Sequence, residues 1–130
     1  MLSPSGPATP TARLSIIAEP AFSSGDIVWV PFPFVDAPRL RERPALVVSA
    51  LSPLADIPLL WVLMITSAAN HGWHGDISLE QCFAECGLPV PCVIRTAKIA
   101  TVEAGRACKG GAVPADVLNE VRRTLERLIL

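Results

Sequence analysis

The sequence has no excess of charge of either sign, and this argues against one broad class of function. It contains 11 Lys+Arg and 12 Asp+Glu among 130 residues, for a formal net charge of −1. Proteins that coat nucleic acid without selectivity usually carry a clear surplus of basic residues. Any nucleic-acid binding by this chain must therefore depend on a local cluster of basic side chains.

A long uninterrupted hydrophobic run is also missing, although 51% of the residues are hydrophobic. The most apolar stretch, residues 44–66, is interrupted by three prolines and by Asp56 near its middle. A membrane-spanning helix needs about 20 consecutive apolar residues, so this stretch predicts two strands, 45–48 and 59–65, joined by a loop. We expect the surplus apolar surface to form a homodimer interface rather than to contact a membrane.

The first residues lack the basic start and continuous apolar core of an export signal. Residues 1–22 are instead rich in Pro, Ser, Thr and Ala, a composition typical of a flexible tail. We expect this tail to precede a single domain, residues 23–130. A cytoplasmic location follows, and in that reducing environment the cysteines are expected to be thiols. They are Cys82, Cys86, Cys92 and Cys108.

Composition and turn signals predict several short strands, rich in β-branched and aromatic residues. The expected strands are 25–34, 44–49, 59–66, 76–79, 92–95 and 98–102. Two loops are expected between them, the charged segment 35–43 and the small-residue segment 67–75. Residues 80–86 could form two helical turns that Gly87 ends.

The last part of the chain has the pattern of an amphipathic helix that opens at position 114 or 116. Val117, Val121, Leu125 and Leu128 recur at spacings of four, four and three, with charged residues opposite. Short strands followed by one terminal helix predict a mainly β, α+β domain or a small barrel covered by helices.

The conventional catalytic signatures do not occur, neither the phosphate-binding P-loop nor the G-x-S-x-G elbow nor the H-E-x-x-H zinc motif. Polar residues at strand ends are the remaining candidates. Arg43 stands at the entry to the expected strand 44–49, and the proline after it favours an extended conformation. Its guanidinium suits a phosphate because it offers paired donors and a permanent charge. The competing interpretation is a solvated loop arginine.

Thr66 and Ser67 end the expected strand 59–66. Hydroxyls at such a boundary usually satisfy backbone groups in a turn. In a catalytic site they could instead donate hydrogen bonds to a phosphoryl oxygen on which charge develops in the transition state.

Two histidines and two cysteines have a spacing that allows a zinc site, with His71 and His74 followed by Cys82 and Cys86. Free cysteine is a common small core residue, and loop histidines are usually polar surface. We therefore expect no metal site.

Basic residues are unevenly distributed along the chain. None occurs between Arg43 and Arg95, and residues 44–94 have a net charge of −4. Residues 95–109, which include Lys98, have a net charge of +3. If the fold brings the arginines at 39–43 close to Arg95 and Lys98, the two clusters form one basic groove.

Taken together, these segments resemble the MazF/PemK family of type II toxin–antitoxin toxins. The resemblance covers about residues 24–130. Its motifs occur in the family's order and are GDIVWVPFPF at 25–34, RPALVVS at 43–49, ITS at 65–67, GL at 87–88 and VIRTAKIATV at 93–102.

The resemblance implies a small SH3-like β-barrel with helical additions and a C-terminal amphipathic helix, assembled as a homodimer. It implies a metal-independent endoribonuclease without cofactors, which cleaves single-stranded RNA to a 2′,3′-cyclic phosphate and a 5′-OH. A cognate antitoxin protein is the implied partner.

Carried over by position, Arg43 and Thr66 match the family's catalytic arginine and threonine. Because the pKa of arginine exceeds 12, an electrostatic role for Arg43 is favoured over a role as a base. The PemK branch has an aspartate two residues after the arginine that Arg95 matches, whereas this chain has Ala97. The residues expected to bind RNA are Arg39, Arg41, Ser67, Arg95 and Lys98.

Two alternatives stay open. Related toxins of the same fold poison DNA gyrase by protein contact without catalysis, and the key residues would then lie on the terminal helix around 125–130. An inactive relic is the other possibility.

Overall fold

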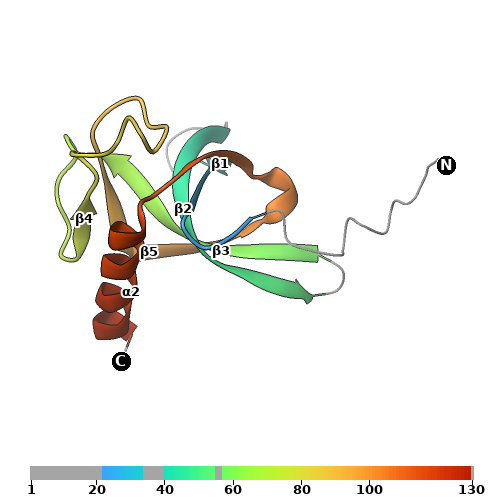
Figure 1. The fold of residues 1–130 in the computed structure, drawn as a ribbon. Coiled ribbons are helices and arrows are strands. Elements are labelled where there is room, and N and C mark those ends of the chain that lie inside the picture. Colours follow the sequence, from blue (N-terminus) through green and yellow to red (C-terminus); the bar gives the residue numbers. More distant parts are fainter. Residues whose placement is uncertain (1–21, 34–39, 55–56, 130) are drawn as a thin grey trace.

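The computed structural model describes residues 22–33, 40–54 and 57–129, a sheet of six strands and one long helix (Figure 1). The elements are β1 Asp26–Pro33, β2 Leu40–Leu54, β3 Ile57–Ser67, β4 Asp76–Ser78, β5 Cys92–Glu103, the 3₁₀ turn η1 Ala104–Arg106, β6 Cys108–Ala112 and α2 Ala115–Ile129. Among the described residues, no helix is long and apolar enough to cross a membrane.

The strands pair antiparallel in the order β4-β5-β3-β2-β1-β6. The sheet is strongly curved, and the end of the β2–β3 hairpin projects away from the rest of the domain (Figure 1). The end strands β4 and β6 do not pair with each other in the described part of the chain. The expected mainly β, α+β fold with a C-terminal helix is confirmed, but the sheet stays open and does not close into a barrel.

Alternating side chains on the strands give the domain two apolar clusters, one on each face of the sheet. On the first face, Ile27, Leu46 and Leu63 pack with Val121 of α2 and with Leu79 and Leu88 of the segment after β4. On the second face, Val28, Ala45, Val62 and their neighbours form a separate cluster that includes Phe22. The expected tail, residues 1–22, otherwise lies outside the described residues.

Several predicted boundaries were wrong because pairing extends strands beyond their apolar runs. Residues 40–43, expected in a loop, begin β2, which continues to Leu54. The expected strands 92–95 and 98–102 are one strand, β5, and its register with β3 shifts between the pairs Leu63↔Ile99 and Met64↔Arg95. The strand β6 was not predicted, since its sequence CKGGA has almost no apolar pattern.

The segment 80–86 forms successive turns rather than a helix. The amide of Cys86 donates to the carbonyls of Cys82 and Phe83, and that of Leu88 donates to Phe83. Gly87 follows with a φ of 85°, so its expected role as the residue that ends the turns is confirmed. The helix α2 begins one residue after Pro114, and Val121, the middle of the predicted apolar stripe, is fully buried.

Candidate functional site

One row of residues crosses five strands of the sheet and locates the candidate site. Val28 of β1 pairs with Ala45 of β2, which pairs with Met64 of β3, and Met64 pairs with Arg95 of β5. Arg95 in turn pairs with Asp76 of β4. Directly paired residues of a sheet share a face, so this row starts in the second apolar cluster and ends in a charged pair. The site therefore lies on the face opposite α2.

Arg43 and Thr66 lie on that same face, at the same end of neighbouring strands. Arg43 comes two residues before Ala45, and Thr66 comes two residues after Met64. Because β2 and β3 run antiparallel, both shifts lead to the same end of the sheet. Because side chains alternate, a shift of two residues keeps the face. Both residues are half-buried. The fold thus places on one face of neighbouring strands the two residues that the sequence singled out for catalysis, although they are 23 positions apart in the chain.

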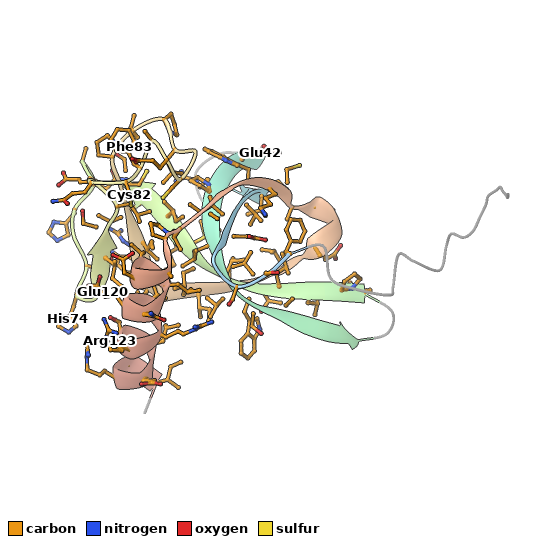
Figure 2. The ribbon with its side chains drawn as sticks, in the orientation of Figure 1. Glu42, His74, Cys82, Phe83, Glu120 and Arg123 are labelled. Carbon is orange, nitrogen blue, oxygen red and sulfur yellow. The ribbon has the colours of Figure 1, made fainter. Side chains whose placement is uncertain are left out.

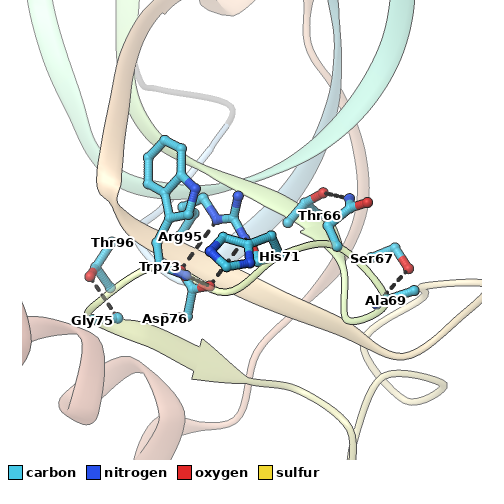
Figure 3. A network of polar contacts seen from close by, with 10 residues as sticks. Thr66, Ser67, Ala69, His71, Trp73, Gly75, Asp76, Arg95 and Thr96 are labelled. Carbon is cyan, nitrogen blue, oxygen red and sulfur yellow. Dashed lines mark hydrogen bonds and ion pairs between the residues drawn. The ribbon is translucent and has the colours of Figure 1, made fainter.

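The Thr66 hydroxyl is held by the loop that follows β3. Asn70 Nδ2 donates to Thr66 Oγ1 at 2.6 Å, and the amide of Ala69 donates to Ser67 Oγ at 3.2 Å (Figure 3). A hydroxyl has one donor and two acceptor sites. Since Thr66 Oγ1 already accepts from Asn70, its own hydrogen is directed elsewhere, and the oxygen has a fixed position from which to donate to a ligand.

Arg95 is the most enclosed charged side chain of the site. Its Nε donates to Asp76 Oδ1 at 3.3 Å, and its Nη2 donates to Asp76 Oδ2 at 3.1 Å and to the His71 carbonyl at 2.7 Å (Figure 3). The side chains of Arg95 and Asp76 are only 10% and 12% exposed. A forked arginine–carboxylate pair in this setting is directional and strong, so Arg95 anchors the loop 68–75 to β5.

Trp73 extends the same network to the surface. Its backbone amide donates to Asp76 Oδ2 at 2.9 Å, and its ring lies 4.5 Å from Arg95 Cζ. The exposed Lys98 places Nζ 5.9 Å from the centroid of the same ring. Guanidinium and ammonium groups over an indole are attracted by its negative face. The loop thus exposes Trp73 with its backbone held by Asp76 and its ring held by Arg95.

The two basic clusters predicted from the sequence are partly brought together. Arg43 on β2 and Arg95 on β5 flank β3 on opposite sides, which corresponds to about 10 Å between the strand axes. Arg39 lies outside the described residues, and of Arg41 only the backbone, in β2, is described. The position of these two side chains stays a prediction.

Three residues of the network were not selected from the sequence, namely Asn70, Trp73 and Asp76. The first two lie in the expected loop 67–75, and Asp76 begins the expected strand 76–79. The signal that could have found them is the cluster of polar and aromatic residues NHGWHGD at 70–76, directly after the expected Thr66–Ser67 strand end. Binding residues lie disproportionately on loops that a rigid scaffold positions.

The histidines and cysteines do not converge. His71 contributes its carbonyl to Arg95, while His74, which lies beside α2 (Figure 2), lines a cavity with Glu120 and Arg127. Cys82 and Cys86 contact each other, with their sulfurs 3.7 Å apart, in the turns that pack on the first apolar cluster. Within residues 22–33, 40–54 and 57–129, no three His, Cys, Asp or Glu side chains could hold a metal ion. The zinc alternative has no support here.

The two buried thiols, Cys86 and Cys92, are weaker acids than an ordinary cysteine because their pKa values are raised. Burial raises the pKa of Cys86 to about 12, and its hydrogen bond with Cys82 and the charges of Cys82 and Glu85 add to the effect. Burial also raises the pKa of Cys92. Both thiols are therefore neutral at physiological pH, as expected for core cysteines rather than nucleophiles or metal ligands.

Comparison with known proteins gives one family. The family described as "PemK-like, MazF-like toxin of type II toxin-antitoxin system" has a sequence model that matches residues 23–129. No curated protein matches by sequence.

Three solved structures illustrate the similarity of the fold. The structure of MazF from Deinococcus radiodurans is 27% identical, covering 82% of this chain and 94% of that one with a TM-score of 0.58. A MazE-MazF structure from the same organism is 28% identical, covering 82% and 92% with a TM-score of 0.56. The Mycobacterium tuberculosis toxin MazF-mt6 is 15% identical, covers 80% and 95%, and has a TM-score of 0.61, which shows the shared fold alone.

Proposed function

Because the chain belongs to the PemK-like, MazF-like toxins of type II toxin–antitoxin systems, we propose that it is a metal-independent endoribonuclease that cleaves single-stranded RNA. The observation that carries the proposal is the placement of Arg43 and Thr66 on one face at the same end of adjacent strands. A permanent positive charge beside an oriented hydroxyl is suited to a phosphate group on which negative charge develops.

The reaction we propose is transfer of the phosphorus from the 5′-oxygen to the neighbouring 2′-oxygen. A P–O2′ bond forms while the P–O5′ bond breaks, the 2′-OH loses its proton and the leaving 5′-oxygen gains one. The products are a 2′,3′-cyclic phosphate and a 5′-OH. Arg43 neutralises the non-bridging oxygens of the five-coordinate phosphorus, and the Thr66 hydroxyl donates to one of them while Asn70 fixes its position.

For Arg95 we propose a positioning role within the RNA site. Asp76 and the His71 carbonyl already engage its guanidinium, and the side chain is 10% exposed. Its charge is therefore largely balanced by Asp76 before any phosphate arrives. Ser67 and the exposed Lys98 contact the RNA more directly, together with the arginines at 39 and 41.

The test is cleavage of a long single-stranded RNA by purified protein in the presence of EDTA, with the termini of the products identified. We expect cyclic phosphate and 5′-OH ends, and we expect R43A and T66A each to lower the rate by at least about 100-fold, as when one transition-state donor is removed. Matched controls are R106A, since Arg106 is exposed on η1, and T101A, since Thr101 is exposed on β5. Wild-type rates in both R43A and T66A would reject the assignment.

The non-catalytic alternative has one supporting feature, because Leu128 and Ile129 at the end of α2 are 42% and 73% exposed. A toxin that acts through protein contact would arrest growth with cellular RNA intact. R43A and T66A would then stay toxic, whereas substitution of Ile129 would abolish toxicity. Absence of both toxicity and cleavage would indicate an inactive relic.

We also propose a cytoplasmic homodimer that is neutralised by an antitoxin. Two large apolar side chains on neighbouring strands support self-association, since Trp61 and Ile99 are 45% and 50% exposed. The Deinococcus MazE-MazF structures pair that MazF with a second protein. Growth arrest that is relieved by expression of a small neighbouring gene would identify such an antitoxin here.

A further inference from the structure

The tryptophan in the loop after β3 is exposed in a way that folding alone does not explain. Trp73 keeps 43% of its surface accessible and belongs to neither apolar cluster. Large aromatic side chains gain stability mainly by burial, so an indole held at the surface by other groups suggests contact with a ligand. Here the groups that hold it are charged rather than apolar.

Trp73 is held at two points. Its backbone amide donates to Asp76 Oδ2 at 2.9 Å, and its indole ring lies against Arg95, whose Cζ is 4.5 Å from the ring centroid. Arg95 is in turn held by both oxygens of Asp76 and by the His71 carbonyl (Figure 3). Arg95 contacts the ring, yet 43% of the Trp73 surface stays accessible, which leaves indole surface for a second planar group. Little conformational entropy is lost when that group binds.

The residues around the indole indicate what kind of planar group would bind there. The exposed Lys98 places its ammonium nitrogen 5.9 Å from the ring centroid, where it can meet a negative charge attached to whatever stacks on the indole. A planar aromatic group with an adjacent anion is the description of a nucleotide. Bases of single-stranded RNA stack on aromatic side chains in this way, and lysines follow the backbone phosphates.

The stacking surface is connected to the proposed catalytic hydroxyl by a short stretch of chain. Asn70, which donates to Thr66 Oγ1 at 2.6 Å, stands three residues before Trp73 in the loop anchored by Arg95. We propose that Trp73 is the base-stacking residue of the RNA site, holding a nucleobase next to the cleaved phosphate while Lys98 contacts the phosphate of that nucleotide. This inference rests on the proposed function and assigns a binding role to a residue outside its catalytic pair.

The experiment compares W73L with W73F, because phenylalanine keeps an aromatic face whereas leucine keeps only apolar volume. The probe is a 2′-O-methyl RNA of mixed sequence, labelled at one end, which binds but cannot be cleaved through its 2′-oxygen. We expect W73L to weaken binding about 10-fold or more, since loss of one stacked base typically costs about 1–3 kcal/mol. W73F should stay within about 3-fold of wild type.

Lys98 is tested through the dependence of binding on salt. K98M should reduce the slope of log K against log salt by roughly 0.7, the amount for one phosphate contact on a single strand. The matched control is K109M, because Lys109 is also exposed but pairs with Asp26 at 3.3 Å on the edge strand β6. Its slope should equal that of wild type. Equal slopes in all three proteins would overturn the phosphate contact.

Cleavage assays separate this inference from the proposed function. With a cleavable RNA, W73L should raise KM by a factor similar to its loss of binding and leave kcat within about 3-fold. Unchanged binding and KM in a W73L protein of normal thermal stability would overturn the stacking role and leave RNA cleavage standing. Equal losses in W73L and W73F would also overturn it. If the wild-type protein cleaves no RNA, the proposed function fails, while the uncleavable probe still decides whether Trp73 binds a base.

Discussion

The pair formed by Arg95 and Asp76 should dominate the stability of the loop that holds Trp73, and D76N tests this directly. The substitution keeps the shape of the side chain but removes the charge that faces a guanidinium only 10% exposed. Asp76 accepts from Arg95 Nε, from Arg95 Nη2 and from the Trp73 amide. The asparagine side chain has one acceptor oxygen in place of two, so these donors cannot all be satisfied.

The size of the effect follows from burial. Removing one partner of a buried ion pair leaves an uncompensated charge and typically costs about 3–5 kcal/mol. The lower end applies here, since the His71 carbonyl and the Trp73 ring still face the guanidinium. We therefore expect a loss of about 3 kcal/mol, which for a domain of this size lowers Tm by roughly 12 °C.

The assay is thermal unfolding followed by circular dichroism at neutral pH, with E103Q as the matched control. Glu103 pairs with Arg106 at 4.0 Å, but their side chains are 57% and 65% exposed. Exposed pairs contribute about 0–1 kcal/mol, so E103Q should move Tm by no more than about 4 °C. If D76N lowers Tm no further than E103Q does, the argument from the buried charge is refuted.

A double variant distinguishes the unpaired charge from a simple loss of packing. In D76N/R95M the buried guanidinium is replaced by an apolar side chain of similar length, so the penalty for an unpaired charge disappears. We expect this variant to be more stable than D76N by about 1 kcal/mol or more. A further loss on adding R95M would mean that the guanidinium stabilises the loop through its other contacts.

Two further predictions concern the segment after β4. G87A should lower the free energy of unfolding in urea by more than about 2 kcal/mol, because Gly87 has a φ of 85° and an added Cβ would collide with the backbone of Gly110. The control G72A has open space around its added Cβ and should lower it by well under 1 kcal/mol. Similar urea midpoints for the two variants would contradict this. Alkylation at pH 8 should reach the exposed Cys108 at least about 100-fold faster than Cys86, because thiolate reacts and burial raises the pKa of Cys86 to about 12. The rate at Cys86 should rise with pH up to that value, and peptide mass spectrometry would expose the error if both were labelled equally in the folded protein.

Elements with a local signal could be predicted from the sequence. The strand that carries Trp29 and the helix around Val121 follow from β-branched composition and from apolar spacing. The site residues Arg43 and Thr66 came from strand ends and from family motifs. Their roles stay proposals, but the structure places them on one face of neighbouring strands.

Features that depend on distant partners were missed. The strand β6 has the sequence CKGGA and is a strand because β1 offers it an edge, with Val28 opposite Lys109. The length of β2 beyond Ser49 depends on pairing with β3 in the same way. Backbone hydrogen bonds to another strand form whatever the side chains are, so a segment without β-branched or aromatic residues shows no local sign that it is a strand.

The sequence by itself determined the mainly β composition, the terminal amphipathic helix, the absence of an uninterrupted apolar span in the most hydrophobic stretch, and the family, because each is encoded in local pattern or motif order. Only the tertiary structure decided what surrounds Arg95. From the sequence it was a basic residue in a segment of net charge +3, available to a phosphate. In the fold it is a buried side chain that both oxygens of Asp76 engage, 19 positions away. The reason is physical: charge adds up along a sequence without regard to distance, whereas the effect of a guanidinium depends on its burial and on the carboxylate that the sheet register places beside it.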